Sequence, residues 1–176
     1  MRELRVRGKI KNVFRGFIRN IYGASKVKLA LFTIFMSILD MVVTYSVYSA
    51  NPKLFFEKEL NKWFRSNVLN YGFPLAAVFF VLLELGITVA ALLLRFRAAK
   101  ILVFNRGLAH LLCFNWYVHL FLNISTRIID FINNVCLHSL LGGTIIAFAN
   151  DKEFYNSLFR VIDKVGGKFC KLTKRA

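Results

Sequence analysis

Long apolar stretches, separated by segments rich in Lys and Arg, constrain the fold of this chain more than any other feature. A helix needs about 20 apolar residues to cross the roughly 30 Å hydrocarbon core of a bilayer. Stretches of about this length occupy residues 29–49, 72–94, 107–124 and 131–149. Only 19% of the 176 residues are charged, whereas a soluble domain has about 25%. We therefore expect an all-α, polytopic membrane helix bundle with four transmembrane helices.

The last two stretches are more polar than the first two. Residues 107–124 include two His and two Asn, and residues 131–149 include two Asn and one His. Irregular backbone is tolerated at membrane depth only where protein or water shelters it. A broken or re-entrant pair of helices is therefore an alternative to two full crossings.

The distribution of basic residues predicts the orientation. With four crossings and both termini on one side, 20 of the 25 Lys and Arg residues lie on that side and 5 on the other. Basic residues concentrate in cytoplasmic segments, so an N-in, C-in arrangement is expected. A net charge of +16 in a soluble protein would suggest nucleic acid, but topology explains it here. Nucleic acid is not an expected partner.

Two basic amphipathic segments are predicted to flank the membrane domain. The expected division is an N-terminal segment 1–28, a transmembrane domain 29–149 and a C-terminal tail 150–176. Such segments bind the anionic lipids of an inner leaflet, although a soluble partner is the competing interpretation. The residues expected at the lipid surface are Lys9, Lys11, Arg15, Arg19, Lys164 and Lys168.

The connection 51–71 mixes aromatic and charged residues. It is predicted to be either an interfacial anchor, as is common for Trp and Phe at bilayer edges, or a short helix that covers a cavity.

Two carboxyl groups lie near the middle of the first two stretches. Asp40 shares a helical face with Thr44, and Glu84 is followed one turn later by Thr88. A carboxyl at mid-membrane depth is costly and is a functional hypothesis by default. The alternative is that these groups are neutral, or paired with a His or with Arg127, and serve only helix packing.

The third and fourth stretches add amides and imidazoles at helical spacing. Asn115 and His119 share one face, and Asn134 and His138 share another, while His110 lies five residues before Asn115. A lone buried His is more often a hydrogen-bonded core residue than a ligand. The candidate ion- or substrate-binding residues are Asp40, Thr44, Glu84, Thr88, Asn115, His119, Asn134 and His138.

No motif assigns a cofactor. The three Cys residues form no CxxC pair, and no phosphate loop, HExxH or GxSxG pattern is present. The sequence therefore predicts no particular cofactor or metal.

The first half of the chain resembles an uncharacterised group of small prokaryotic multi-span membrane proteins. The shared pattern is an Asp-x3-Thr late in one span and an Asn-Pro where that span ends, here Asp40, Thr44, Asn51 and Pro52. That group has an acidic residue two positions before the Asn-Pro, where this chain has Ser49. The resemblance covers about residues 35–95 and implies no biochemical activity.

Three classes of function fit these features. The first is an oligomeric transporter or channel of the inner cell membrane that uses the buried carboxylates. The second is an accessory or structural subunit of a membrane complex. The third is an intramembrane metal-dependent enzyme that acts on a lipid.

Overall fold

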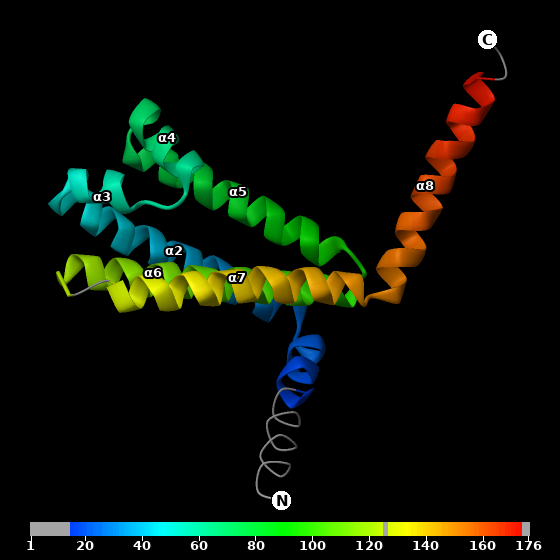
Figure 1. The fold of residues 1–176 in the computed structure, drawn as a ribbon, viewed down its shortest axis with the longest axis horizontal. Coiled ribbons are helices and arrows are strands. Elements are labelled where there is room, and N and C mark those ends of the chain that lie inside the picture. Colours follow the sequence, from blue (N-terminus) through cyan, green and yellow to red (C-terminus); the bar gives the residue numbers. More distant parts are fainter. Residues whose placement is uncertain (1–14, 125–126, 174–176) are drawn as a thin grey trace, which may run out of the picture.

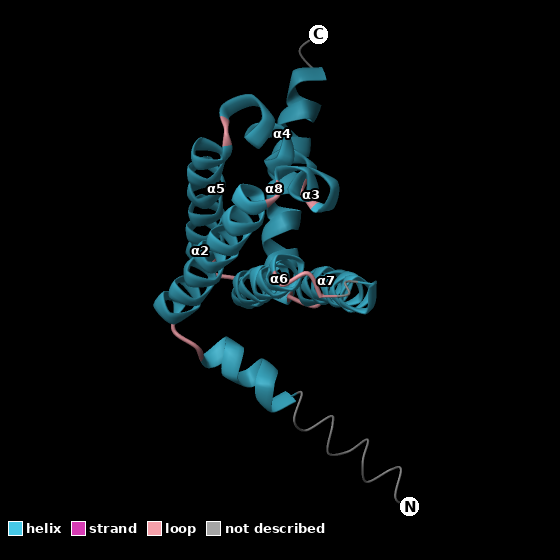
Figure 2. Ribbon diagram, turned by 90° about the vertical axis from the view of Figure 1, so that its left-hand side faces the viewer, coloured by secondary structure: helices cyan, strands magenta, loops and turns pink. Residues whose placement is uncertain are grey.

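The chain is a bundle of long helices. The computed structural model describes residues 15–124 and 127–173, and this part of the chain is largely helical and contains no strand. A helical segment at residues 15–23 precedes the first long helix (Figures 1 and 2). The helices that follow are α2 (Lys26–Ala50), α3 (Pro52–Lys58), α4 (Lys62–Tyr71), α5 (Phe73–Leu93), α6 (Arg97–Phe121), α7 (Arg127–Ala149) and α8 (Lys152–Thr173).

Short polar side chains set where the helices begin. The side chains of Ser25, Asn51 and Asn61 accept hydrogen bonds from backbone N–H groups in the first turns of α2, α3 and α4. Pro52 is the first residue of α3, where its missing N–H costs little. Between α4 and α5, Gly72 has φ 79°, a conformation that a residue with a Cβ rarely adopts.

The four long helices of the bundle alternate in direction. The Thr33 hydroxyl donates to the Val103 carbonyl at 2.8 Å, and seven residues further along both helices Asp40 contacts His110. Helices α2 and α6 therefore run parallel, while α5 and α7 run back between their ends (Figure 1). One end of the bundle has α3 and α4. The other, here called the terminal end, has residues 15–23, the α5–α6 connection and the start of α8.

Helix α6 is central, because it packs against α2, α5 and α7. It packs tightly against α2 at Gly107, where an added Cβ would lie 2.4 Å from the ring of Phe32. At the α3–α4 end the core is aromatic, with Phe55 and Phe64 fully buried against Phe73.

The connection 51–71, for which the sequence leaves open an interfacial anchor or a short covering helix, forms two helices, α3 and α4. Its rings divide between two environments: Phe55 and Phe64 are buried in the core, whereas Trp63 is 47% exposed. Burial of Phe55 and Phe64 holds α3 and α4 against the end of the bundle. The exposed ring of Trp63 is consistent with an anchor at the membrane interface.

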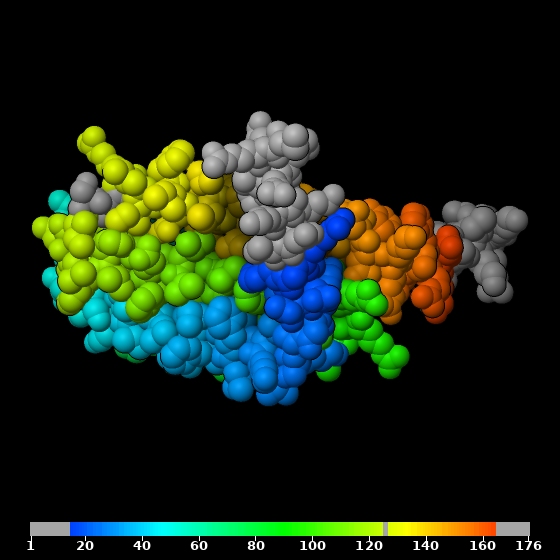
Figure 3. Space-filling view, turned by 90° about the horizontal axis from the view of Figure 1, so that it is seen from below, coloured from blue at the N-terminus to red at the C-terminus, as the bar shows by residue number. Residues whose placement is uncertain are grey.

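The N-terminal helical segment crosses the side of the bundle. Ile21 is buried, and the ring of Phe17 packs edge-on against Phe104 at 5.5 Å. Lys100 donates hydrogen bonds to the carbonyls of Tyr22 at 2.6 Å and Ala24 at 2.7 Å, which are free where the helix ends. Figure 3 shows this dark-blue segment lying over α2, α6 and α7.

Three helices of the described chain are long and apolar enough to cross a membrane: α2, α5 and α7. They coincide with the first, second and fourth predicted spans. The predicted third span, 107–124, is corrected, because it is the second half of a longer helix, α6, that begins at Arg97 and fails this test. The physical reason is that α6 has charged residues along its first half, including Lys100 and Arg106.

Large apolar side chains cover the outside of the bundle. Leu82 and Leu93 of α5 and Ile128, Phe131 and Ile145 of α7 are all at least half exposed. Soluble monomers rarely expose apolar surface this extensive, so these faces require a covering of lipid or protein.

Candidate functional site

Four charged side chains from three helices form a chain of contacts inside the bundle. His110 Nδ1 on α6 lies 2.9 Å from Oδ2 of Asp40 on α2. The other ring nitrogen, Nε2, lies 3.4 Å from Oε2 of Glu84 on α5. The side chains of all three residues are less than 10% exposed. One imidazole therefore bridges two buried carboxyl groups on different helices. We call Asp40, Glu84, Arg106 and His110 the charged cluster.

Arg106 completes the charged cluster. Its Nε donates to Glu84 Oε2 at 3.1 Å, and its Nη2 donates to Glu84 Oε1. Such a two-point contact fixes the carboxylate in position as well as balancing its charge. Arg106 and His110 are four residues apart on α6, so they occupy one face of this helix and approach Glu84 together.

Helix periodicity on α2 directs Asp40 inward. Thr33, Ser37, Asp40 and Thr44 are all buried on one face of α2. Thr44 donates to Asp40 Oδ1 at 3.4 Å, so Asp40 accepts from its own helix on one oxygen and contacts His110 with the other. The Asp-x3-Thr spacing thus orients the carboxyl group toward α6.

A cavity of about 280 Å³ lies beside the cluster and extends toward α3 and α4. Glu59 and Asn61, from the α3–α4 connection, line it together with Asp40, Glu84 and Tyr117. Tyr117 donates to Glu59 Oε2, and the backbone N–H of Asn61 donates to Oε1 at 2.6 Å. Burial raises the pKa of the Glu59 carboxyl above its usual value, although the hydrogen bond from Tyr117 opposes this effect.

The charges around this cavity can rearrange by proton transfer. Arg106 and ionised Glu84 balance each other, which leaves Asp40 and His110 as a pair. A proton that moves between Asp40 Oδ2 and His110 Nδ1 interconverts a charged pair and a neutral pair without changing the net charge. The pair can therefore hold a proton in a low-dielectric interior without leaving an isolated charge.

Two buried hydroxyls continue the polar path toward the terminal end. Ser37 lies one turn before Asp40 on α2, and Thr88 lies one turn after Glu84 on α5. Within the described chain neither hydroxyl has a hydrogen-bond partner. Buried polar groups usually find one, so each hydroxyl could form a hydrogen bond with a water molecule.

Four of the eight residues singled out from the sequence lie on this path: Asp40, Thr44, Glu84 and Thr88 are all buried. The other four do not join them. Asn115 is exposed on α6, and Asn134 and His138 are exposed on α7. His119 is half-buried, and its Nδ1 is buried without a partner in the described chain.

Other amides join α6 to α7. Asn133 donates from its side chain to the Leu112 carbonyl at 3.2 Å, and Asn105 donates to the Thr144 hydroxyl at 2.8 Å. These contacts are interhelical hydrogen bonds of the kind that stabilises membrane helix packing.

Sequence reasoning did not identify Arg106 as part of the site. Arg106 lies just before the third predicted span, 107–124, and the sequence offers Arg127 as the partner of a carboxyl group, but Arg127 is exposed. The available signal was the i, i+4 spacing of Arg106 and His110, together with the need of a buried Glu84 for a counter-ion.

The structure describes the side chains of three of the six residues predicted at the lipid surface. Arg15, Arg19 and Lys164 are exposed. Lys9, Lys11 and the side chain of Lys168 lie outside the described residues.

Within the described residues, no group of three or more His, Cys, Asp and Glu side chains is arranged to hold a metal ion. Both ring nitrogens of His110 contact carboxylates that already pair within the cluster. Comparison of the chain with protein-family models, with curated proteins and with solved structures finds no match.

Proposed function

We propose that the chain is a multi-pass protein of the inner cell membrane that crosses the bilayer four times, with both termini in the cytoplasm. The three apolar helices and the alternating helix directions support this topology. With Arg106 counted inside the bundle, 19 basic residues belong to the terminal end and its flanking segments, and 5 to the α3–α4 end. The terminal end is therefore assigned to the cytoplasm.

Helix α6 is proposed to cross the membrane in addition to α2, α5 and α7. It has 25 residues, the same length as α2, and this corresponds to about 37 Å of helix. Three of its polar side chains have partners on other helices: Arg106 on α5, His110 on α2 and α5, and Asn105 on α7. A helix with this pattern can cross a bilayer because its neighbours cover the charges.

Within this topology the protein acts as a proton-conducting or proton-coupled transporter. The observation that carries this proposal is the contact of His110 with both Asp40 and Glu84, at mid-bundle and beside a cavity. Chains of Asp, Glu and His are the usual proton relays of membrane pumps and transporters. Protons would enter from the cavity near Glu59, exchange on the Asp40–His110 pair and leave past Ser37 and Thr88.

A subunit function is the second candidate, supported by the surface of α7. Asn134 and His138 are exposed on a helix that is otherwise apolar enough to cross a membrane, and His138 Nδ1 lies 2.7 Å from the carbonyl of Asn134 on the same helix. Polar side chains facing lipid are unfavourable. A second copy of the chain or another membrane protein packed on α7 would cover them.

Proton flux into liposomes tests the transport function. Purified protein is reconstituted with an entrapped pH dye, and an inward proton gradient is imposed. Asp40→Asn, which keeps the side-chain shape and removes the proton site, is expected to slow proton entry by at least about tenfold. Glu57→Gln is the matched control, because Glu57 is an exposed carboxylate outside the cluster. Equal flux in wild type and Asp40→Asn would refute the function assigned to Asp40.

A further inference from the structure

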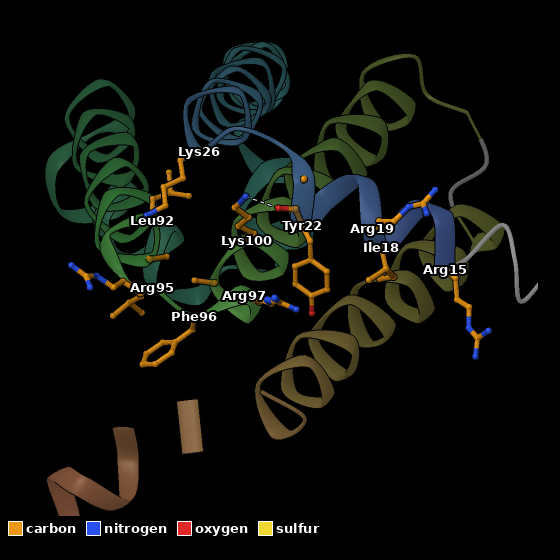
Figure 4. Close-up of a pocket in the computed structure, with 14 residues that line it drawn as sticks. Arg15, Ile18, Arg19, Tyr22, Lys26, Leu92, Arg95, Phe96, Arg97 and Lys100 are labelled. Atoms are coloured by element: carbon orange, nitrogen blue, oxygen red, sulfur yellow. Dashed lines mark hydrogen bonds between the residues drawn. The ribbon is translucent and has the colours of Figure 1, made fainter. Parts of the chain in front are cut away.

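A second, strongly basic pocket lies at the terminal end of the bundle. It has a volume of about 860 Å³ and is formed by residues 15–23, the start of α2 and the α5–α6 connection (Figure 4). Its described lining includes no carboxylate and contains six cationic side chains: Arg15, Arg19, Lys26, Arg95, Arg97 and Lys100.

Five of these six cations are available to a ligand. Lys100 is occupied, since it donates to the carbonyls of Tyr22 and Ala24. The remaining five are exposed, and no carboxylate of the described chain pairs with them. Like charges gathered around one pocket repel one another, and an anion of more than one charge would relieve this repulsion.

A mainly apolar groove adjoins the basic pocket. This groove, of about 960 Å³, lies between residues 15–23, α6 and α7, and it shares Ile18, Tyr22 and Arg97 with the pocket. Ile101 and Leu108 of α6 and Ile146 of α7 supply its apolar walls. Polar residues also line the groove, among them Asn105, Asp151 and Glu153. The two spaces therefore combine a cationic pocket with a mainly apolar groove.

We propose that the terminal end binds one anionic phospholipid, with its phosphate in the basic pocket and an acyl chain in the groove. Lys26 begins α2 and Arg95 lies two residues after the end of α5, so the cations lie where apolar helices end, at the depth of lipid headgroups. Free phosphate would use the cations but not the groove, which is why the lipid is the assigned occupant. This inference rests on the membrane location proposed above, and it does not require transport.

Native mass spectrometry of the full chain in mild detergent tests the cationic part. Phosphatidylglycerol is added at increasing concentration, with phosphatidylcholine and inorganic pyrophosphate as separate comparisons. The triple substitution Arg19→Gln, Arg95→Gln, Arg97→Gln is expected to weaken phosphatidylglycerol binding roughly 100-fold. The matched control removes three cations from the opposite end, Lys53→Gln, Lys58→Gln and Lys62→Gln, and is expected to bind like wild type.

A pair of glycine variants tests the groove. Gly143 lines the groove, Gly142 does not, and an added Cβ at either meets nothing within 4 Å. Gly143→Phe is expected to weaken lipid binding about tenfold by displacing about two methylene groups of the chain, and Gly142→Phe is expected to leave it unchanged. Melting temperatures within a few degrees of wild type establish that each variant is folded.

Several results would overturn the inference. These are equal phosphatidylglycerol affinity in wild type and the triple variant, equal binding of phosphatidylcholine, displacement of the lipid by equimolar pyrophosphate, or equal effects of the two glycine variants. Lipid binding and proton flux are measured separately, so failure of the lipid proposal can be distinguished from failure of the transport proposal.

Discussion

Arg106 on α6 forms a two-point ion pair with Glu84 on α5, with Nε 3.1 Å from Oε2. This contact connects α5, which is apolar enough along its length to cross a membrane, to α6, which is more polar. It also explains how α6 can lie inside the bundle despite its charges, because the neighbouring helix supplies the counter-ion. The pair is therefore expected to be a main determinant of the position of α6.

Removal of Arg106 is expected to destabilise the protein more than removal of both partners. In Arg106→Gln, Glu84 is left buried without its counter-ion, at a cost of roughly 3 kcal/mol. This is the lower end of the usual range because the Arg106 side chain is 26% exposed. Adding Glu84→Gln should restore most of the loss. Thermal unfolding in detergent measures both, and a double variant less stable than Arg106→Gln would contradict this interpretation.

Gly107 is expected to resist substitution because α2 and α6 are so close there. An added Cβ would meet two ring atoms of Phe32 at 2.4 and 2.6 Å. Gly107→Ala should cost about 1–2 kcal/mol, since overpacking exceeds the gain in helix propensity. Gly86→Ala, where the Cβ meets nothing within 4 Å, should be neutral or slightly stabilising. Restoration of stability by adding Phe32→Leu would identify the ring as the cause, and equal stability of the two alanine variants would argue against it.

Asp151 is expected to stabilise two helices at once. Its Oδ2 accepts from the Ala98 N–H at the start of α6, and its Oδ1 accepts from Glu153 and Phe154 at the start of α8. Desolvation opposes ionisation, but these N–H groups outweigh it and lower the pKa of Asp151. Asp151→Ala should cost about 1–2 kcal/mol in thermal unfolding, whereas Asp151→Asn, a comparable capping residue, should cost less. Equal losses would show that capping is not the cause.

Glu59 is expected to make stability depend on pH. Because burial raises its pKa in the folded protein, the stabilising neutral form is present below the usual pKa near 4.5 and is lost as the pH rises through the raised value. Glu59→Gln should therefore become more stable relative to wild type as the pH rises from 4.5. Thermal unfolding from pH 4 to 8 measures this, with exposed Glu57→Gln as a control that should show no such trend. A constant difference between Glu59→Gln and wild type would contradict the assignment.

The sequence was sufficient to predict the helices that satisfy a simple physical rule. Helices α2, α5 and α7 have about 20 mostly apolar residues, and the inward face of α2 follows from the spacing of Thr33, Asp40 and Thr44. Length and periodicity are local properties, so one sequence reveals them.

The composition of the charged cluster depends on which helices become neighbours, which is not a local property. Asn134 and His138 have the same spacing as a buried polar face, yet they are exposed because α7 contacts the bundle through Asn133 and Thr144 instead. Arg106 was missed for the opposite reason. A charge at the edge of an apolar stretch indicates the end of a span unless a buried acid on another helix pairs with it.

Proton flux in a His110→Gln variant tests the central claim most directly, because His110 is the residue that contacts both Asp40 and Glu84. Gln retains hydrogen-bonding capacity but cannot take up a proton at physiological pH. In liposomes under an imposed proton gradient, wild type should acidify the interior, and His110→Gln should do so at least about tenfold more slowly. A folded His110→Gln variant that carries protons as fast as wild type would contradict the claim that the cluster is the proton path.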